Sequence, residues 1–146
     1  MTGVDNAGKL AHMTSLGADA VIDHRRTDVT AAGQRYDLVL DLVAYRSVVA
    51  YRRIVAPGGR YRCVGGSVST LLQVATIGTA VGRLTGRRLG VLAVRAGPEH
   101  FTPVADLCVA GELDVHIDRT FGLDDVAEAL AYVGDGRAVG KVVVEM

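Results

Sequence analysis

Apolar residues follow two alternating patterns along the chain. Short, nearly continuous apolar runs predict strands covered on both faces, as in a parallel sheet. The clearest run is YDLVLDLV, residues 36–43. Between the runs, apolar residues recur every three or four positions, which predicts amphipathic helices. The predicted strands span residues 2–4, 20–23, 36–43, 61–64, 90–94, 116–121 and 141–145.

Helical patterns separate these strands. They cover residues 8–16, 47–55, 69–85 and 98–110, and a last helix carries Val126, Leu130 and Val133. Pro57-Gly58-Gly59 is expected to end the second of these helices, because proline cannot continue a helix and glycine adopts a positive φ. Strands that alternate with helices indicate βαβ units, so the predicted class is α/β with a parallel sheet.

Composition adds few constraints on function. The chain has 146 residues, 49% of them hydrophobic and 22% charged, which is typical of a globular domain. Its formal net charge is zero, so no basic excess indicates a nucleic acid or an anionic membrane as partner. Cys63 and Cys108 each lie in an apolar run and are expected to be buried free thiols. No secretion signal is evident, and the expected compartment is the cytoplasm.

Five motifs, in this order, carry a family resemblance. They are TGVDNAGKL (2–10), SLGADAVIDH (15–24), RYDLVLDLVAYRSVVAYRRIVAPGGRYRCVGGS (35–67), HIDRTFGLDDVAEAL (116–130) and GRAVGKVVVEM (136–146). The chain resembles the C-terminal portion of the medium-chain dehydrogenase/reductase superfamily, in its zinc-type alcohol dehydrogenase and quinone oxidoreductase group. This resemblance implies a Rossmann-like, doubly wound parallel sheet.

The resemblance also implies a domain division. Residues 1–115 correspond to a partial NAD(P)-binding domain, and residues 116–146 to a segment that returns to the substrate domain in relatives. Relatives carry a substrate domain, a first strand and a glycine-rich turn upstream, so the chain is expected to be a truncated half that is inactive alone. A mis-started reading frame, a gene remnant and a genuine short protein all remain open.

Cofactor contacts are expected just after the strands, because a dinucleotide lies across the carboxyl ends of a doubly wound sheet. Asp5, Asn6 and Lys9 would face the adenosine ribose, and His24 the adenine. The residues expected near the phosphates and the nicotinamide are Val43, Ala44, Gly65, Gly66 and Ser67, with Lys141 at the start of the last strand.

Both cofactor types find support at the ribose position. Asp5 favours NAD, because a carboxylate accepts hydrogen bonds from its free 2′-hydroxyl group. Asn6 and Lys9 instead favour the 2′-phosphate of NADP. Quinone oxidoreductase relatives favour NADPH, and that is the cofactor expected. In the alternative interpretation Asp5 only caps the following helix, Lys9 is a surface lysine, His24 is exposed, and the glycines only form turns. Lys141 could likewise serve only a salt bridge.

The function implied is hydride transfer between NAD(P)H and a quinone, enone or alcohol, provided that the absent half is supplied. No nucleophile–base pair stands out, so no catalytic residue is named. Zinc is not expected in this chain, because the family's ligands lie upstream and the four histidines (His12, His24, His100 and His116) are scattered.

Partners and rival functions follow from the absent first strand. Without it, strands 2–4 and 36–43 each have an open edge, which residues 1–4 or another chain would fill. A homodimer through residues 90–94 is also expected from the resemblance.

One rival function is a non-catalytic fragment that acts as an interaction module. The other is a methyltransferase that uses S-adenosylmethionine, because the region from residue 36 to 66 resembles part of that fold.

Overall fold

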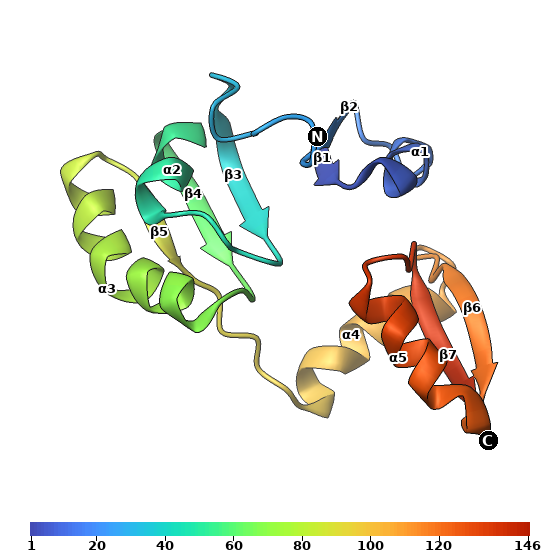
Figure 1. Cartoon of the computed structure of the whole chain (residues 1–146). Coiled ribbons are helices and arrows are strands. Elements are labelled where there is room, and N and C mark those ends of the chain that lie inside the picture. The colour runs from blue at the N-terminus through green and yellow to red at the C-terminus, as the bar shows by residue number, and fades with distance from the viewer. The chain divides into compact units, whose positions relative to one another are not determined.

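The computed structural model describes all 146 residues, Met1–Met146 (Figure 1). Its strands are β1 (Thr2–Asp5), β2 (Ala20–Asp23), β3 (Tyr36–Asp41), β4 (Val55–Cys63), β5 (Arg88–Val91), β6 (Ile117–Gly122) and β7 (Lys141–Glu145). Its α-helices are α1 (Leu10–Ser15), α2 (Val48–Ile54), α3 (Val68–Leu84), α4 (Pro98–Val109) and α5 (Val126–Gly134). Short 3₁₀ turns at Ala7–Lys9 and Leu123–Asp125 precede α1 and α5.

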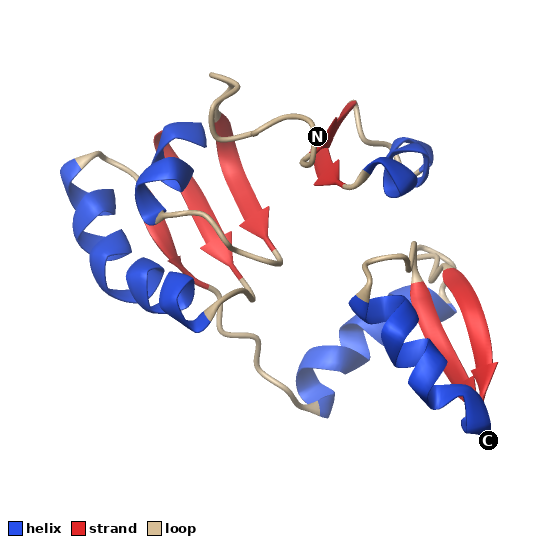
Figure 2. Ribbon diagram, in the orientation of Figure 1, coloured by secondary structure: helices blue, strands red, loops and turns tan.

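The strands form three parallel sheets, and helices connect them (Figure 2). The first sheet pairs β1 with β2, the second has the order β3-β4-β5, and the third pairs β6 with β7. Every pairing is parallel. The α/β class and the parallel pairing are therefore confirmed. Residues 1–4 do not fill the edge of β3, because β1 pairs only with β2.

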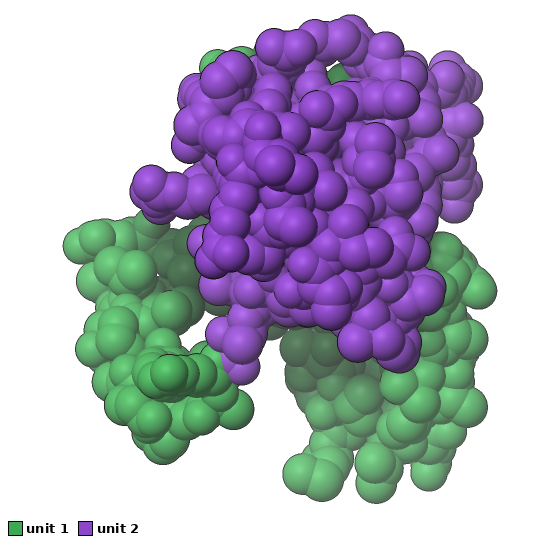
Figure 3. All heavy atoms as spheres, turned by 90° about the vertical axis from the view of Figure 1, so that its left-hand side faces the viewer, with its two compact units in different colours: residues 1–23, 95–146 green, residues 24–94 purple.

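The chain forms two compact units (Figure 3). Unit 1 consists of Met1–Asp23 together with Arg95–Met146, and unit 2 of His24–Val94. Unit 2 contains the sheet β3-β4-β5 with helices α2 and α3. Unit 1 contains the sheet β1-β2 with α1, the helices α4 and α5, and the sheet β6-β7. The domain division at residue 115 stays a prediction.

The main hydrophobic core lies in unit 2, on one face of its sheet. Val39, Tyr61 and Leu89 are paired in register across the three strands and share this face. Val48 and Val74 from helices α2 and α3 pack against it, and the Tyr61 side chain is fully buried. Burial of these apolar side chains supplies most of the stability of unit 2.

The opposite face of the same sheet is open. Leu38 and Leu40 of β3 are 63% and 57% exposed, and they pair in register with Arg60 and Arg62 of β4. Strand β3 is also an edge strand, since β4 is its only neighbour. An apolar edge strand of this kind tends to recruit another strand.

Several boundaries differ from the prediction; β5, for example, spans Arg88–Val91 rather than residues 90–94. Strand β4 begins at Val55, directly after α2, so Pro57-Gly58-Gly59 lies inside the strand rather than before it. The three residues form an irregularity where the register with β3 shifts between Tyr36 and Leu38, and Gly58 there has a φ of +79°. Strand β3 ends at Asp41, two residues early, because the Asp41 carboxylate accepts a hydrogen bond from the Val43 N–H at 3.1 Å and closes a turn.

The neutral total charge conceals a strong separation between the units. Unit 2 has eleven arginines, no lysine and three acidic residues, a formal charge of +8. Unit 1 has five basic and thirteen acidic residues, a formal charge of −8. The whole-chain charge is therefore a poor guide to partners, because a surface field depends on where the charges lie.

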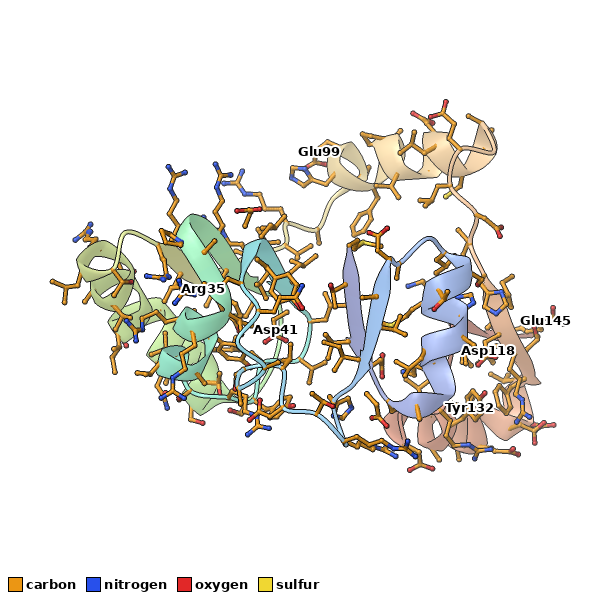
Figure 4. The ribbon with its side chains drawn as sticks, turned by 90° about the horizontal axis from the view of Figure 1, so that it is seen from above. Arg35, Asp41, Glu99, Asp118, Tyr132 and Glu145 are labelled. Carbon is orange, nitrogen blue, oxygen red and sulfur yellow. The ribbon has the colours of Figure 1, made fainter.

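One carboxylate connects β6, α5 and the residues before β7 in the tail of unit 1. Asp118 of β6 and Tyr132 of α5 are labelled in Figure 4. Asp118 accepts hydrogen bonds from the Tyr132 hydroxyl at 2.9 Å and from the Val139 N–H at 3.0 Å. The Val139 bond first, and the Tyr132 bond second, lower the pKa of Asp118 below its usual range. The guanidinium of Arg119 lies 4.8 Å from the centre of the Tyr132 ring, and that of Arg137 lies 4.7 Å from it.

We expect this connection to weaken in acid. A carboxyl group whose pKa is lowered by folding stabilises the fold above its unfolded pKa of about 4, and this contribution disappears as the pH falls through the folded value. The amide proton of Val139 should therefore move upfield below about pH 4 in proton NMR spectra. Asp118→Asn should abolish that acid transition, whereas the control Asp124→Asn should retain it. A transition that persists in Asp118→Asn would contradict the assignment.

Candidate cofactor-binding site

A carboxylate and an ammonium group meet at the carboxyl end of β1. The Nζ atom of Lys9 lies 3.5 Å from Oδ2 of Asp5, and the two side chains are 21% and 31% exposed. Asp5 is the last residue of β1 and is paired in register with Asp23 of β2. Two carboxylates therefore end neighbouring strands, and Lys9 neutralises the first of them.

Asn6 has a structural role at the same place. Its side-chain oxygen accepts a hydrogen bond from the Gly8 N–H at 3.0 Å, so Asn6 and not Asp5 caps the turn that follows β1. Its Nδ2 group donates to Asp5 and, at 3.2 Å, to the carbonyl of Gly136, just after α5. The alternative in which Asp5 is the helix cap is therefore wrong.

The carboxyl ends of β3 and β4 are joined by their own backbones. Ala44 and Gly66 form a bridge beyond the two strands, and the Ala44 N–H donates to the Gly65 carbonyl at 2.8 Å. A Cβ atom at position 66 would lie 2.9 Å from the nitrogen and carbonyl carbon of Ala44, and nearer still to its oxygen. The two glycines thus permit a close approach between two loops of the protein, whether or not a ligand also binds there.

The N-terminus of α3 carries three hydroxyl groups. Ser67 caps this 17-residue helix by accepting from the Thr70 N–H at 3.2 Å. Its hydroxyl also lies 3.0 Å from that of Ser69 and 2.8 Å from that of Thr70. Hydroxyl groups and free N–H groups at the positive end of a helix suit an anionic group such as a phosphate.

The remaining predicted contacts lie in three different places. Val43 follows β3 and is 69% exposed, next to the buried Ala44. His24 is half-buried and follows β2. Lys141 begins β7 and lines a cavity of unit 1 that includes none of Asp5, Asn6 and Lys9. The predicted residues therefore form one group at the end of β1 and a second group after β3 and β4, and His24 and Lys141 belong to neither.

One pair of side chains was not foreseen. The imidazole rings of His12 and His116 have their centres 4.6 Å apart, with 37° between their planes. These two histidines are scattered in the sequence, because more than a hundred residues separate them along the chain. Helix α1 and the residue before β6 bring them together in unit 1. No local sequence pattern predicts this contact.

A family profile described as zinc-binding dehydrogenase matches residues 16–144. The chain belongs to the zinc-binding dehydrogenase family. Its resemblance to medium-chain dehydrogenases and reductases is thereby confirmed.

The relatives of this chain are longer proteins. A chloroplastic quinone oxidoreductase of Triphysaria versicolor is 31% identical over 137 residues, which are 90% of this chain and 40% of that protein. A trans-enoyl reductase of Aspergillus terreus is 31% identical over 144 residues, again 90% of this chain and 40% of that protein. The chain thus spans about two fifths of the length of these relatives.

Solved structures share the fold. A quinone oxidoreductase from Coxiella burnetii superposes with a TM-score of 0.80 at 22% identity, covering 99% of this chain and 44% of that one. An NAD-dependent alcohol dehydrogenase superposes with a TM-score of 0.75 at 18% identity, covering 99% of this chain and 50% of that one. These similarities confirm that the chain has a Rossmann-like fold.

The residues fit a dinucleotide better than they fit zinc. A nicotinamide cofactor is typical of the family, and the half-buried Asp5–Lys9 pair supplies both the acceptor and the cation that a ribose or its phosphate requires. No group of three or more His, Cys, Asp or Glu side chains is arranged to hold a metal ion. We therefore assign no step to zinc.

Two further observations concern the cysteines and membranes. Cys63 is buried and Cys108 half-buried, and both are free thiols. Burial raises the pKa of the Cys63 thiol, which makes it a poor nucleophile. None of the helices is both long enough and apolar enough to cross a bilayer.

Proposed function

We propose that this chain is the cofactor-binding portion of an NADPH-dependent reductase that acts on quinones or enones. The observation that carries the proposal is the half-buried Asp5–Lys9 pair at the carboxyl end of β1. The names of two relatives, a quinone oxidoreductase and a trans-enoyl reductase, support the choice of substrates. When bound, the nicotinamide would supply the hydride, and the residues of this chain would hold the dinucleotide.

Lys9 is the residue that favours NADPH. Its ammonium group has one partner, the Asp5 carboxylate, so it retains N–H groups for a 2′-phosphate. The two oxygens of Asp5 already accept hydrogen bonds from Asn6 and the ion pair from Lys9. The carboxylates of Asp5 and Asp23 would suit the 2′-hydroxyl of NADH instead, so the choice between cofactors depends on Lys9.

Unit 2, taken by itself, offers further residues that are proposed for dinucleotide binding. His24 would stack beside the adenine. The hydroxyl groups of Ser67 and its neighbours, at the N-terminus of α3, would donate hydrogen bonds to a phosphate. Val43, Ala44, Gly65 and Gly66 would form the backbone surface beside it, where no long side chain blocks the approach of a ligand.

The substrate side of the reaction would come from another polypeptide segment. Hydride transfer requires the nicotinamide and the acceptor to be held about 3–3.5 Å apart. We propose that the segment which positions the acceptor also pairs with the free edge of β3, and that the chain without it is inactive. A homodimer through β5, the other edge of the same sheet, is compatible with this arrangement.

The open edge and the exposed Leu38 and Leu40 also favour a second candidate function, a non-catalytic interaction module.

A chimaera tests the proposal. The 146-residue chain alone should oxidise NADPH with quinones or enones no faster than a buffer blank, followed at 340 nm. Joining the unmatched upstream portion of the Triphysaria versicolor quinone oxidoreductase to it should produce turnover. In this chimaera Lys9→Met should raise the KM for NADPH about tenfold to a hundredfold, the cost of losing a charge-assisted hydrogen bond. The KM for NADH should not change.

The control is Arg83→Met, which removes an exposed cation from the end of α3 and should leave both KM values unchanged. Turnover by the chain alone would disprove the proposed dependence on a further segment. Equal effects of Lys9→Met on NADPH and NADH would disprove the proposed role of Lys9. A folded but inactive chimaera would favour the interaction module.

A further inference from the structure

A cavity of about 720 Å³, open to solvent, lies at the surface of unit 1, between α1 and the residues that precede β6 and begin β7. Leu16, Leu113 and Val139 are apolar parts of its lining, and the imidazoles of His12 and His116 line it too. Its volume lies within the range of about 300–1,000 Å³ that is typical of small-molecule sites. None of the residues proposed to bind the dinucleotide at the end of β1 takes part in it.

The two imidazoles form a fixed aromatic surface in this cavity. Their ring centres are 4.6 Å apart. The His116 ring lies directly against the backbone of Gly140, where a Cβ atom would come within 2.7 Å of its Cδ2 atom. The Lys141 N–H donates to the His116 carbonyl at 2.8 Å, which fixes the start of β7 beside that residue. These contacts restrict the motion of the His116 ring, while His116 stays exposed and His12 half-buried, so both rings remain accessible for stacking.

Two opposite charges line the same cavity without partners. The side chain of Lys141 forms no hydrogen bond or ion pair, and neither does that of Asp114. An unpaired ammonium group attracts a carboxylate, and an unpaired carboxylate accepts a hydrogen bond from a hydroxyl group. A ligand that satisfied both would carry an anionic group and a hydroxyl group on an apolar, planar body.

We propose that this cavity binds a planar aromatic carboxylate that also bears a hydroxyl group. The ring stacks on the imidazole surface, the carboxylate pairs with Lys141, and the hydroxyl group donates to Asp114. This site is separate from the dinucleotide site, so it does not depend on the proposed reductase function. Lys141 then serves this ligand rather than the cofactor.

The test uses 6-hydroxy-2-naphthoate as the probe and proton NMR of the whole chain. The chain has four histidines, so each ring can be followed individually. Ring currents of the naphthyl group should shift the ring protons of His12 and His116 as the probe saturates the site, and leave those of His24 and His100 unchanged. Lys141→Met should weaken binding at least tenfold. Lys9→Met, which removes the only other lysine, should leave it unchanged.

Two probe analogues and one further variant test the polar contacts. 2-Naphthol, which lacks the carboxylate, should bind at least tenfold more weakly than the probe. Asp114→Asn should weaken the probe but not 2-naphthoate, which lacks the hydroxyl group, and this variant keeps the test informative if Lys141→Met fails to fold. The proposal is overturned by shifts of all four histidines, by equal affinity for 2-naphthol, or by displacement of the probe by NADPH.

Discussion

Replacing Gly66 by alanine should destabilise unit 2 by roughly 3–5 kcal/mol, as backbone strain and steric overlap add together. Gly66 has a φ of +142°, a value that side chains disfavour. The added Cβ would also overlap with the backbone of Ala44, which cannot move without breaking the bridge between the loops after β3 and β4. Urea unfolding followed by near-ultraviolet circular dichroism is a suitable measurement, since four of the five tyrosines lie in unit 2.

Gly86→Ala provides the matched control for this substitution. Gly86 belongs to the same unit and has a φ of +64°, but no atom lies within 4 Å of the position that its Cβ would occupy. Alanine there should cost only about 1–2 kcal/mol of backbone strain. If the two variants unfold at the same urea concentration, the close approach of the two loops contributes nothing to stability.

Tyr61→Ala should have an effect of similar size, about 3–5 kcal/mol, because it empties the centre of the largest core. The Tyr61 ring is fully buried and stacks on Tyr51, with ring centres 4.4 Å apart. Its hydroxyl group donates to Oδ2 of Asp41 at 2.9 Å. Burial first, and the neighbouring Asp41 charge second, raise the pKa of Tyr61, so the hydroxyl group stays protonated and continues to donate.

Tyr61→Phe separates the two contributions of this side chain. Phenylalanine keeps the stacked ring and removes only the hydrogen bond to Asp41, so it should cost about 1–2 kcal/mol. Urea unfolding should therefore rank the proteins as wild type, Tyr61→Phe and Tyr61→Ala in order of decreasing stability. A Tyr61→Phe variant as unstable as Tyr61→Ala would show that the hydrogen bond, rather than the packing, dominates.

Local patterns in the sequence account for most of the secondary structure. The apolar run at residues 36–43 predicts β3, and the spacing of Val126, Leu130 and Val133 predicts α5. The parallel pairing follows from the alternation of strands and helices. Errors arise where a side chain acts on the backbone, as when the Asp41 carboxylate ends β3 two residues early.

Long-range contacts account for what the sequence does not predict at the candidate site. Asp5 and Lys9 are four residues apart, so their ion pair can be predicted from their spacing in the sequence. The bond from Asn6 to the Gly136 carbonyl joins residues 130 positions apart, and the contact between His12 and His116 is similarly distant. Gly65 and Gly66 are visible in the sequence, but only the fold shows that they accommodate Ala44 and its neighbours.

The edge strand β3 has a consequence for the life of this protein in a cell. We expect an apolar strand that has an unpaired edge and carries two leucines more than half exposed to be recognised by chaperones and quality-control proteases. Whatever pairs with that edge would protect the chain from degradation. The amount of the protein that accumulates should then follow the supply of that partner rather than its own rate of synthesis.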